Sequence, residues 1–414
     1  MRTSAILPAR LYLRQTFAAL QYRNYRIWFT GQLLSLVGTW MQTTAQGYLV
    51  YELTKSPVYL GYVGFAAGIP TWLFTLYGGL IADRMSRRTM LIITQTSMML
   101  LAFILAFLVF LQIIQPWMIV LLALCLGIAN AFDAPARVSF VAELVDHKDL
   151  TNAIALNSTM FNSATVVGPA IAGIAYASLG PAWCFTVNGI SFLAVIIALL
   201  LMRLPKSYTD VKRTSAIRDI KEGFRNAIDN RTIRILIINM GFLSMFGLSL
   251  MTLLPAWSSD ILNGNATTYG LLLSARGIGA LIGALMIASL SSRNVRGKLW
   301  MVGNLTMPVL MAAFAFARWI PLSTALIIII GWSFMVQVNT SNAIVQTQVE
   351  DHMRGRVMSI YTLIFFGGMP LGALLVGYMA DKIGEPNTLL IDALILMAFA
   401  LFVYVKMSFL RREG

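Results

Sequence analysis

Twelve long apolar runs constrain this chain more than any other feature. A helix of about 20 apolar residues is long enough to cross the hydrocarbon core of a bilayer. The runs occupy residues 27–50, 58–81, 89–112, 116–136, 152–178, 182–203, 233–257, 268–291, 298–317, 321–346, 356–380 and 388–409. Charged residues make up 12% of the 414 residues, against about 25% in soluble proteins. The sequence therefore predicts an all-α polytopic membrane protein with twelve transmembrane helices.

The distribution of Lys and Arg predicts the orientation of these helices. With both termini on one side, that side holds 27 of the 31 Lys and Arg, the other side holds only Lys55, Arg318 and Lys382, and Arg276 lies within a run. Positive residues are retained on the cytoplasmic side of a membrane. We expect a multi-pass protein of a bacterial-type cell (inner) membrane with cytoplasmic N- and C-termini. The same placement accounts for the net charge of +14 without a nucleic-acid partner.

The longest polar segment between runs divides the chain into two parts of six runs each. We expect a cytoplasmic tail (1–26), a six-helix bundle (27–203), a cytoplasmic linker (204–232), a second six-helix bundle (233–409) and a short tail (410–414). The two parts repeat weakly. Shifts of 209 and 204 residues pair Gly61 with Gly270, Gly68 with Gly277, Gly168 with Gly372 and Gly173 with Gly377. This favours a duplicated transporter with two pseudo-symmetric bundles.

A short loop between the second and third runs concentrates charge. It follows Gly79 and contains Asp83, Arg84, Arg87 and Arg88, in the order G-x-x-x-D-R-x-x-R-R. Arginines hold such a loop on the cytoplasmic side, and an Asp can pair with them or face the N-terminus of a helix. The alternative is that the loop is basic only because short inner loops generally are.

This loop resembles the loop between helices two and three of the major facilitator superfamily, with Ser86 where that family usually has Gly. Two further stretches are similar to the exporter branch that contains the enterobactin exporter and the macrolide efflux permeases. They begin at Asp133-Ala-Pro-Ala-Arg137 and at Arg354-Gly-Arg356. The resemblance covers nearly all of residues 22–405, and it is specific for the branch but not for the substrate.

The resemblance implies alternating access between two six-helix bundles around a central cavity, usually driven by proton exchange. We expect no cofactor and no metal. It places an inner gate on Gly79, Asp83, Arg84, Arg87 and Arg88. In the family the loop Asp faces the start of helix eleven, here Arg356 to Ser359. A loop Arg pairs with an acid at the end of helix four, here Asp133, and Arg137 lies in the same stretch. The alternative is that these charges only orient the chain.

Polar residues on two runs are candidates for the wall of a substrate cavity. In the first run Gln32, Ser35, Thr39, Gln42 or Thr43, and Gln46 share one helical face. The tenth run repeats the pattern with Ser333, Gln337, Ser341 and Gln348. An unpaired amide in lipid costs several kcal/mol, so these faces meet water and substrate, or hydrogen-bond to other helices. For the single residues Asn130 and Asn239 we favour interhelical hydrogen bonding.

Arg276 is the only Lys or Arg well inside a run, where a charge costs about 2.5–3.5 kcal/mol. Three roles are open: the side chain extends toward the membrane surface, pairs with an acid such as Glu52, or attracts an anionic or carbonyl-rich substrate. We expect no Asp or Glu deep in a run, because Glu52, Asp133 and Asp392 lie toward run ends. Glu52 and Asp133 are the candidates for proton coupling, which rests on the resemblance.

The predicted function is secondary export of amphipathic small molecules, either drug-like compounds or secreted metabolites such as siderophores. Protons are the expected exchange partner. The alternatives are an importer of the same fold or a membrane sensor or scaffold that does not transport. We expect no enzyme, since no intramembrane Asp/His/Glu cluster or G-x4-G-K-[ST] loop is present. The expected partners are the substrate, protons and the lipid bilayer, and the expected state is a monomer.

Overall fold

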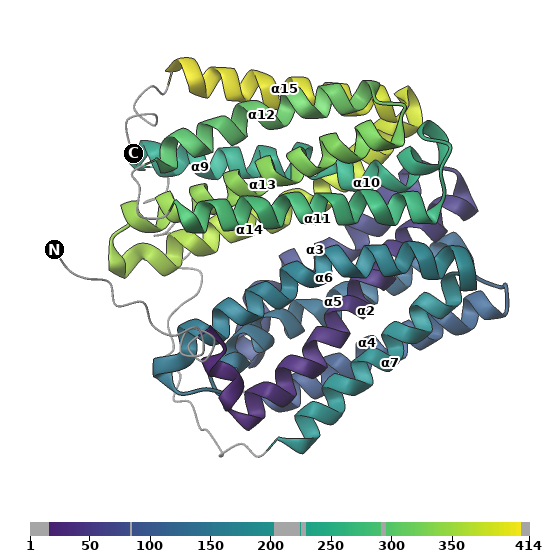
Figure 1. Cartoon of the computed structure of the whole chain (residues 1–414), viewed down its shortest axis with the longest axis vertical. Coiled ribbons are helices and arrows are strands. Elements are labelled where there is room, and N and C mark those ends of the chain that lie inside the picture. Colours follow the sequence, from purple (N-terminus) through teal and green to yellow (C-terminus); the bar gives the residue numbers. More distant parts are fainter. Residues whose placement is uncertain (1–15, 83–84, 203–223, 225–228, 291–294, 407–414) are drawn as a thin grey trace.

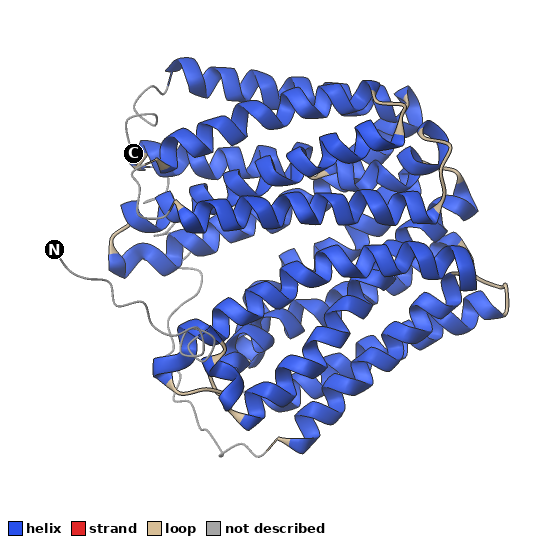
Figure 2. Cartoon of the chain, viewed as in Figure 1, coloured by secondary structure: helices blue, strands red, loops and turns tan. Residues whose placement is uncertain are grey.

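The structure is a computed structural model, and it describes residues 16–82, 85–202, 224, 229–290 and 295–406. Within these residues the chain is helical, with short connections and no strand (Figure 2). The first half contains η1 (Ala18–Gln21), α2 (Arg23–Thr54), α3 (Pro57–Ala82), α4 (Arg87–Phe110), α5 (Pro116–Val141), η2 (His147–Asp149), α6 (Leu150–Leu179) and α7 (Pro181–Leu201).

The second half begins with a composite segment made of α9 (Arg231–Phe242), η3 (Leu243–Gly247), α10 (Ser249–Ala256) and η4 (Trp257–Ile261). Both η3 and η4 are π-helical. The half continues with α11 (Ala266–Ser289), α12 (Arg296–Phe316), α13 (Ile320–Gln348), α14 (Asp351–Ile383) and α15 (Glu385–Lys406).

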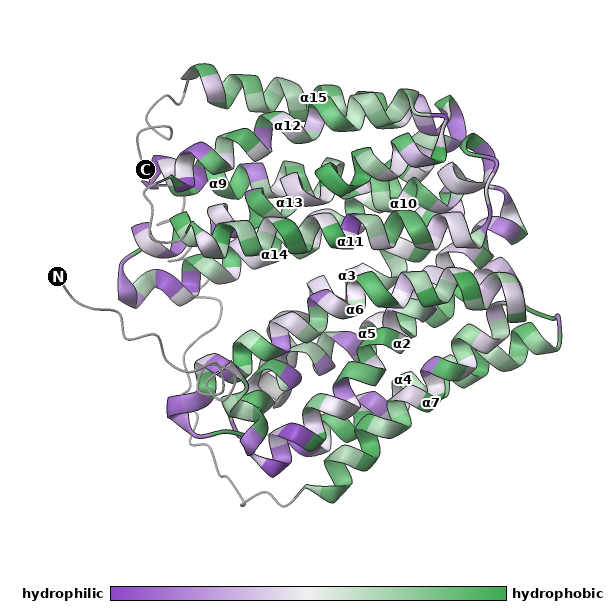
Figure 3. Cartoon of the chain, viewed as in Figure 1, coloured by the Kyte–Doolittle hydropathy of each residue, from purple (hydrophilic) through white to green (hydrophobic). Residues whose placement is uncertain are grey.

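Twelve long helical segments account for most of the described residues. Ten of them are long and apolar enough to cross a membrane, and the other two are α2, with 32 residues, and α3, with 26. Hydrophobic residues dominate the length of the helices and hydrophilic residues gather at their ends (Figure 3). Large apolar side chains such as Leu285, Phe316 and Val405 are more than 60% exposed, which suits contact with lipid tails. The predicted all-α polytopic fold is confirmed.

Local sequence explains where several helices begin and end. Ser86 stands in extended backbone at φ −62° and its hydroxyl accepts a hydrogen bond from Thr89 N at 3.2 Å, so it caps α4. A glycine is not needed at this position because φ is negative. Asn230 caps α9 and Asn265 caps α11 in the same way. The turns after α6 and α14 are made by Gly180 and Gly384 at φ +89° and +82°.

The helices of the two halves pack in the same pattern. In the first half α3 packs on α5, and α4 packs on α5 and α7; six segments later α11 packs on α13, and α12 packs on α13 and α15. The halves meet where α3 packs on α14 and where α6 packs on α11. Figure 1 shows the first half (purple to teal) and the second half (green to yellow) as two layers of helices joined at these contacts.

Glycines allow the halves to approach closely. A Cβ at Gly270 of α11 would lie 2.3 Å from the carbonyl oxygen of Pro169 in α6, and a Cβ at Gly61 of α3 would lie 2.7 Å from that of Ala373 in α14. Only glycine fits such backbone contacts. Three of the four glycine pairs in the sequence repeat therefore lie where the halves touch, whereas Gly168 and Gly372 pack against helices of their own halves.

Hydrogen bonds join the halves toward one end of the molecule, which we name the Lys55 end after the turn between α2 and α3. Tyr51 donates to Asp260 at 2.6 Å and Ser56 donates to Asp381 at 2.9 Å. The opposite end, named the Ser86 end, carries the turn before α4. The helices of the two halves diverge toward the Ser86 end (Figure 1).

Candidate functional site

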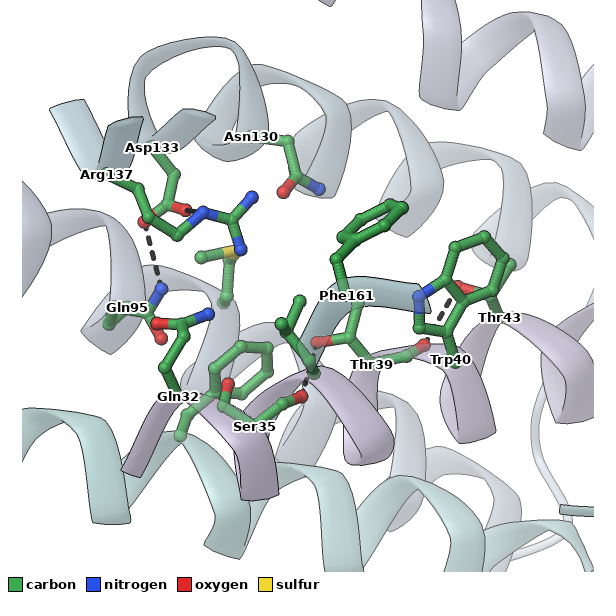
Figure 4. Close-up of a pocket in the computed structure, with 13 residues that line it drawn as sticks. Gln32, Ser35, Thr39, Trp40, Thr43, Gln95, Asn130, Asp133, Arg137 and Phe161 are labelled. Carbon is green, nitrogen blue, oxygen red and sulfur yellow. Dashed lines mark hydrogen bonds and ion pairs between the residues drawn. The ribbon is translucent and has the colours of Figure 1, made fainter. Parts of the chain in front are cut away.

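A cavity of about 210 Å³ lies inside the first half, among α2, α4, α5, α6 and α7 (Figure 4). Its polar wall consists of Gln32, Ser35, Thr39, Thr43, Gln95, Asn130, Asp133 and Arg137. Its apolar wall consists of Leu36, Trp40, Met98, Phe161 and Phe192. One side can hydrogen-bond to a ligand and the other can cover aromatic or aliphatic surface, so the cavity suits an amphipathic molecule.

The polar face predicted on the first span contributes the largest share of this wall. Gln32, Ser35, Thr39 and Thr43 line the cavity from α2. The Thr39 hydroxyl donates to the Ser35 carbonyl oxygen of its own helix at 2.8 Å. The Gln32 side chain is 1% exposed, and its Oε1 accepts no hydrogen bond in the described part of the chain. Since buried polar atoms are normally paired, Oε1 is available to a ligand or water.

The other two glutamines of that face do not line the cavity. Gln42 is buried, and its Oε1 accepts a hydrogen bond at 2.6 Å from Nδ2 of Asn188 in α7. Gln46 is also buried. Of the alternatives Gln42 and Thr43, the structure therefore places Thr43 in the cavity wall and Gln42 in an interhelical hydrogen bond.

Asp133 is the charged centre of the cavity wall. Its carboxylate accepts hydrogen bonds from Oγ1 of Thr94 at 2.8 Å and Nε2 of Gln95 at 2.9 Å, both on α4. Nε of Arg137 lies 3.6 Å from its other oxygen, one helical turn along α5. Asp133 is 1% exposed and Arg137 is 22% exposed. Two donors and a cation compensate the buried carboxylate, while the guanidinium keeps a surface open to the cavity (Figure 4).

The burial of two acids was not predicted. Asp133 was expected near the end of its span, but α5 continues to Val141, eight residues further, which is about 12 Å along a helix. Asp392 is 0% exposed in α15. Both carboxyl groups are therefore buried inside the bundles. For Asp133 the apolar run was misleading, because the run was taken to end at residue 136 whereas α5 continues through a more polar stretch to Val141.

Arg87 and Arg88, the two loop arginines that the structure describes, contact their own half. Nη1 of Arg87 lies 2.5 Å from Oε1 of Glu143, which follows α5. Nη2 of Arg88 donates to the Leu200 carbonyl oxygen in α7 at 3.1 Å. Asp133, the partner expected from the resemblance, lies beside Arg137 and is paired with neither Arg87 nor Arg88. Gly79 lies near the end of α3, and Asp83 and Arg84 lie outside the described residues.

The start of the eleventh span also differs from the prediction. Helix α14 begins at Asp351 after Glu350, so Arg356 to Ser359 lie in its second and third turns. The free N–H groups and partial positive charge of a helix belong to its first turn. A loop carboxylate near Arg356 would therefore meet that guanidinium rather than free backbone N–H groups.

The candidates of the second half lie apart from the cavity. Nε2 of Gln337 donates to the Gly303 carbonyl oxygen of α12 at 3.1 Å, so this amide serves interhelical packing. Ser341, which like Gln337 belongs to α13, is 0% exposed. The Arg276 guanidinium lies over the ring of Phe334, 5.4 Å from its centroid. Glu52, one of its proposed partners, instead accepts a hydrogen bond from Tyr176.

Two cavity residues were missed or undervalued. Gln95 was not singled out, although an amide in a strongly apolar run is itself a signal. Asn130 was expected to hydrogen-bond between helices, but it lines the cavity. A single sequence gives the helical face of such a residue only relative to its own helix, and the neighbouring helices decide what the face meets.

Comparisons with known proteins agree with this architecture. The profile of a family described as "Transmembrane secretion effector" matches residues 14–412. The chain is 26% identical to a staphyloferrin A transporter of Staphylococcus aureus, over 88% of this chain and 91% of that protein. It is 26% identical to the multidrug efflux pump Tap of Mycolicibacterium fortuitum (85% and 88% covered) and 23% identical to macrolide efflux protein A of Streptococcus pyogenes (91% and 94% covered).

Solved structures share the fold at lower identity. A nucleoside transporter superposes with a TM-score of 0.76 at 15% identity, over 92% of this chain and 98% of that one. A bacterial homologue of the human lysosomal transporter Spinster, in an inward-facing and unoccupied conformation, superposes with a TM-score of 0.71 at 15% identity, over 94% and 96%. The chain belongs to the transmembrane secretion effector family, and it is an efflux or secretion transporter of the major facilitator superfamily.

Proposed function

We propose that this protein exports amphipathic small molecules, either drug-like compounds or secreted metabolites of the siderophore kind, by alternating access and in exchange for protons. The names of its relatives support this class of cargo: a staphyloferrin A transporter, a multidrug efflux pump and a macrolide efflux protein. In this proposal the Lys55 end faces the outside of the cell, the Ser86 end faces the cytoplasm, and the protein works as a monomer.

The cavity of the first half is the observation that carries the proposal. It combines an unpaired amide oxygen of Gln32, the Asp133–Arg137 pair and the aromatic rings of Trp40 and Phe161. Drug-sized ligands occupy pockets of about 300–1,000 Å³, so the cavity of about 210 Å³ holds only part of such a molecule. The remainder of the ligand would contact the second half, where Arg276 supplies a positive charge.

The packing of the halves supports alternating access. Their close glycine contacts and hydrogen bonds lie toward the Lys55 end, and their helices diverge toward the Ser86 end. A cycle requires a second arrangement in which the Lys55 end opens and the Ser86 end closes. We assign the closing contacts to the loop residues Asp83, Arg84, Arg87 and Arg88 and to Arg356.

Asp83→Asn tests this gate. The substitution removes one charge and keeps the side-chain size, so transport should fall while the amount of protein in the membrane stays the same. A fall in abundance that explains the whole loss of transport would make the loop a folding element instead.

The cargo itself is best found by comparing a deletion strain with its complemented parent in a toxicity and metabolite-export screen. Any compound that depends on the gene is then tested in everted membrane vesicles. An exporter accumulates the compound in these vesicles, and collapse of the pH gradient should stop the accumulation. Loss of preloaded compound from everted vesicles would indicate import, and accumulation that persists without the gradient would remove the proton from the mechanism.

A further inference from the structure

Asp392 of α15 is buried far from the cavity, against the break between η3 and α10. It is 0% exposed, and Oδ2 lies 2.6 Å from the hydroxyl of Ser249, the first residue of α10. Its second oxygen, Oδ1, has no hydrogen-bond partner in the described part of the chain. A buried carboxylate ion with one neutral partner is costly, whereas a neutral carboxylic acid in the same place costs far less.

The hydrogen-bond geometry around Ser249 leaves room for one proton on this carboxyl group. The Ser249 hydroxyl contacts both Oδ2 of Asp392 and the carbonyl oxygen of Phe246. A serine hydroxyl has a single hydrogen to donate. If it donates to the Phe246 carbonyl, the contact with Asp392 is a hydrogen bond only when the carboxyl group is the donor. The chain of donors then runs from Asp392 to Ser249 to Phe246, and every contact is satisfied.

The charged groups of the neighbouring segments do not lie where they could neutralise a carboxylate at Asp392 in place of that proton. Residues Leu243 to Ala256, which form η3 and α10, contain no titratable side chain. Helix α12 has Arg296 and Lys298 in its first turn only. Helix α14 has its charged residues near its ends and two tyrosines between them: Asp351, His352, Arg354, Arg356, Tyr361, Tyr378, Asp381 and Lys382.

On α15 itself, Glu385 lies two turns before Asp392, and Tyr404 and Lys406 lie at the other end of the helix. Among the described residues, Ser249 is the only side chain that hydrogen-bonds to Asp392. In the part of the chain that the structure describes, no cation therefore pairs with the carboxyl group to compensate a negative charge.

The break next to Asp392 is connected to the surface between the two halves. Phe246 belongs to the π-helical segment η3, and such segments are frequent at functional sites. A Cβ at Gly372 of α14 would lie 2.2 Å from the Met245 carbonyl oxygen of η3, so α14 lies directly on this segment. A few residues away, Pro370 of α14 packs on Gly68 of α3 in the other half. A shift of η3 and α10 would therefore reach the contact on which the halves move.

We infer that Asp392 is a proton-binding site of the transport cycle: its carboxyl group holds a proton in the conformation described here and releases it to water when α10 moves away from α15. This inference rests on the proposed proton exchange and names the residue that performs it. The proton leaves the carboxyl oxygen for a water molecule, and the carboxylate that remains is neutralised when a proton returns. Neither acid favoured by the sequence, Glu52 or Asp133, lies at this break.

Infrared spectroscopy of the purified protein in lipid nanodiscs tests whether the proton is present. The wild type should show the carbonyl stretching band of a protonated carboxylic acid at neutral pH. Asp392→Asn should remove this band, and Ser249→Ala should shift it because the hydrogen-bond partner is lost. Asp229→Asn, which changes an exposed acid, is the matched control and should leave the band in place.

A wild type without the band, or a band that persists unchanged in Asp392→Asn, would overturn the inference. If Asp392→Asn does not fold, the Ser249→Ala spectrum decides alone, and an unshifted band overturns the inference.

A distance measurement tests whether this proton is coupled to the movement of the halves. Spin labels at Lys148 and His352, exposed residues at the Ser86 end of the two halves, report their separation without any cargo. In the wild type, the ratio of short to long distances should change by about tenfold or more across the titration, the size of typical coupling between sites. In Asp392→Asn it should not respond, whereas in Asp229→Asn it should respond as in the wild type. A pH response that survives in Asp392→Asn would refute coupling through this residue.

A wild type with the infrared band but without any response of the distance to pH would have a different meaning. It would overturn proton coupling as proposed for the protein, and with it the role of Asp392 in the cycle, while the band would still establish a buried neutral acid. The two failures are therefore distinguishable.

Discussion

Tyr51 of α2 donates a hydrogen bond to Asp260 of η4 at 2.6 Å and so joins the first half to the second at the Lys55 end. Tyr51 is 2% exposed, and the carboxylate it binds lies at the protein surface. Close by, Tyr48 contacts the rings of both Tyr176 and Tyr269, which lie on different halves. These tyrosines form a seal that must separate if cargo is to leave at this end.

Tyr51→Phe should open the Lys55 end more often. A hydrogen bond to a charged group contributes about 1.5–3 kcal/mol, so its loss should raise the open population about tenfold or more. A cysteine at Thr43, in a background without Cys125 and Cys184, reports this as faster reaction with a membrane-impermeant maleimide added at the Lys55 end. Tyr59→Phe, which changes a tyrosine of α3 that packs on Tyr62, should leave the rate unchanged. Equal rates in wild type and Tyr51→Phe would show that this bond does not hold the seal.

The two charges of the cavity should differ in their effect on stability. Arg137→Gln leaves the 1% exposed Asp133 without its cation, and breaking a buried pair in this way costs about 3 kcal/mol or more. Asp133→Asn should cost less, because the remaining guanidinium is 22% exposed and can be hydrated. The double variant should be more stable than Arg137→Gln alone. Thermal unfolding of the four proteins gives the coupling energy, and strictly additive losses would contradict an ion pair.

Gly270→Ala should disturb the contact between the halves. The added Cβ would lie 2.3 Å from the Pro169 carbonyl oxygen and 3.1 Å from the backbone of Gly173, so α11 and α6 must separate. We expect a shift toward conformations that are open at the Lys55 end, seen as a longer distance between spin labels at Leu111 and Trp319. Gly355→Ala, a helical glycine with nothing within 4 Å of the added Cβ, is the control. An unchanged distance in Gly270→Ala would show that the contact can adjust without moving the halves.

Arg276→Gln should weaken transport of anionic cargo more than transport of neutral cargo. The guanidinium lies over Phe334 in the second half, and no ion pair with Glu52 is found among the described residues. The comparison uses a carboxylate-bearing cargo and its methyl ester in the same vesicles. Arg318→Gln, which changes a second arginine lying over an aromatic ring, should reduce neither. Equal losses for acid and ester in Arg276→Gln would indicate a packing role.

The sequence was sufficient for the fold because lipid imposes a simple requirement. A span must satisfy its backbone hydrogen bonds internally, and the twelve apolar runs could do so only as helices. The polar face of α2 was predictable for the same reason, since spacing of three and four residues places Gln32, Ser35, Thr39 and Thr43 together. What could not be predicted is which neighbour each residue meets. Gln42 and Thr43 are one residue apart, which is about 100° around a helix. Thr43 therefore faces the cavity while Gln42 faces Asn188.

The partners of the charged residues could not be predicted from the sequence either. Arg137 lies one turn from Asp133 on the same helix and competes with the loop arginines for it, and Arg87 finds Glu143 instead. The π-helical segment just before Ser249 gave no signal either, because a π-helical turn and an α-helical turn have the same composition. Asp392 was visible as an acid near a run end, but its burial depends on α10 and α15 packing together.

The central claim is that the two halves open at one end while they close at the other. Distances between spin labels test it most directly when one pair, Lys148 and His352, reports the Ser86 end and another pair, Leu111 and Trp319, reports the Lys55 end, in lipid nanodiscs over the same series of pH values and cargo concentrations. Alternating access predicts two distance populations at each end, with the short distance at the Ser86 end gaining population in step with the long distance at the Lys55 end. A single unchanged population in both pairs, or both ends opening together, would contradict it.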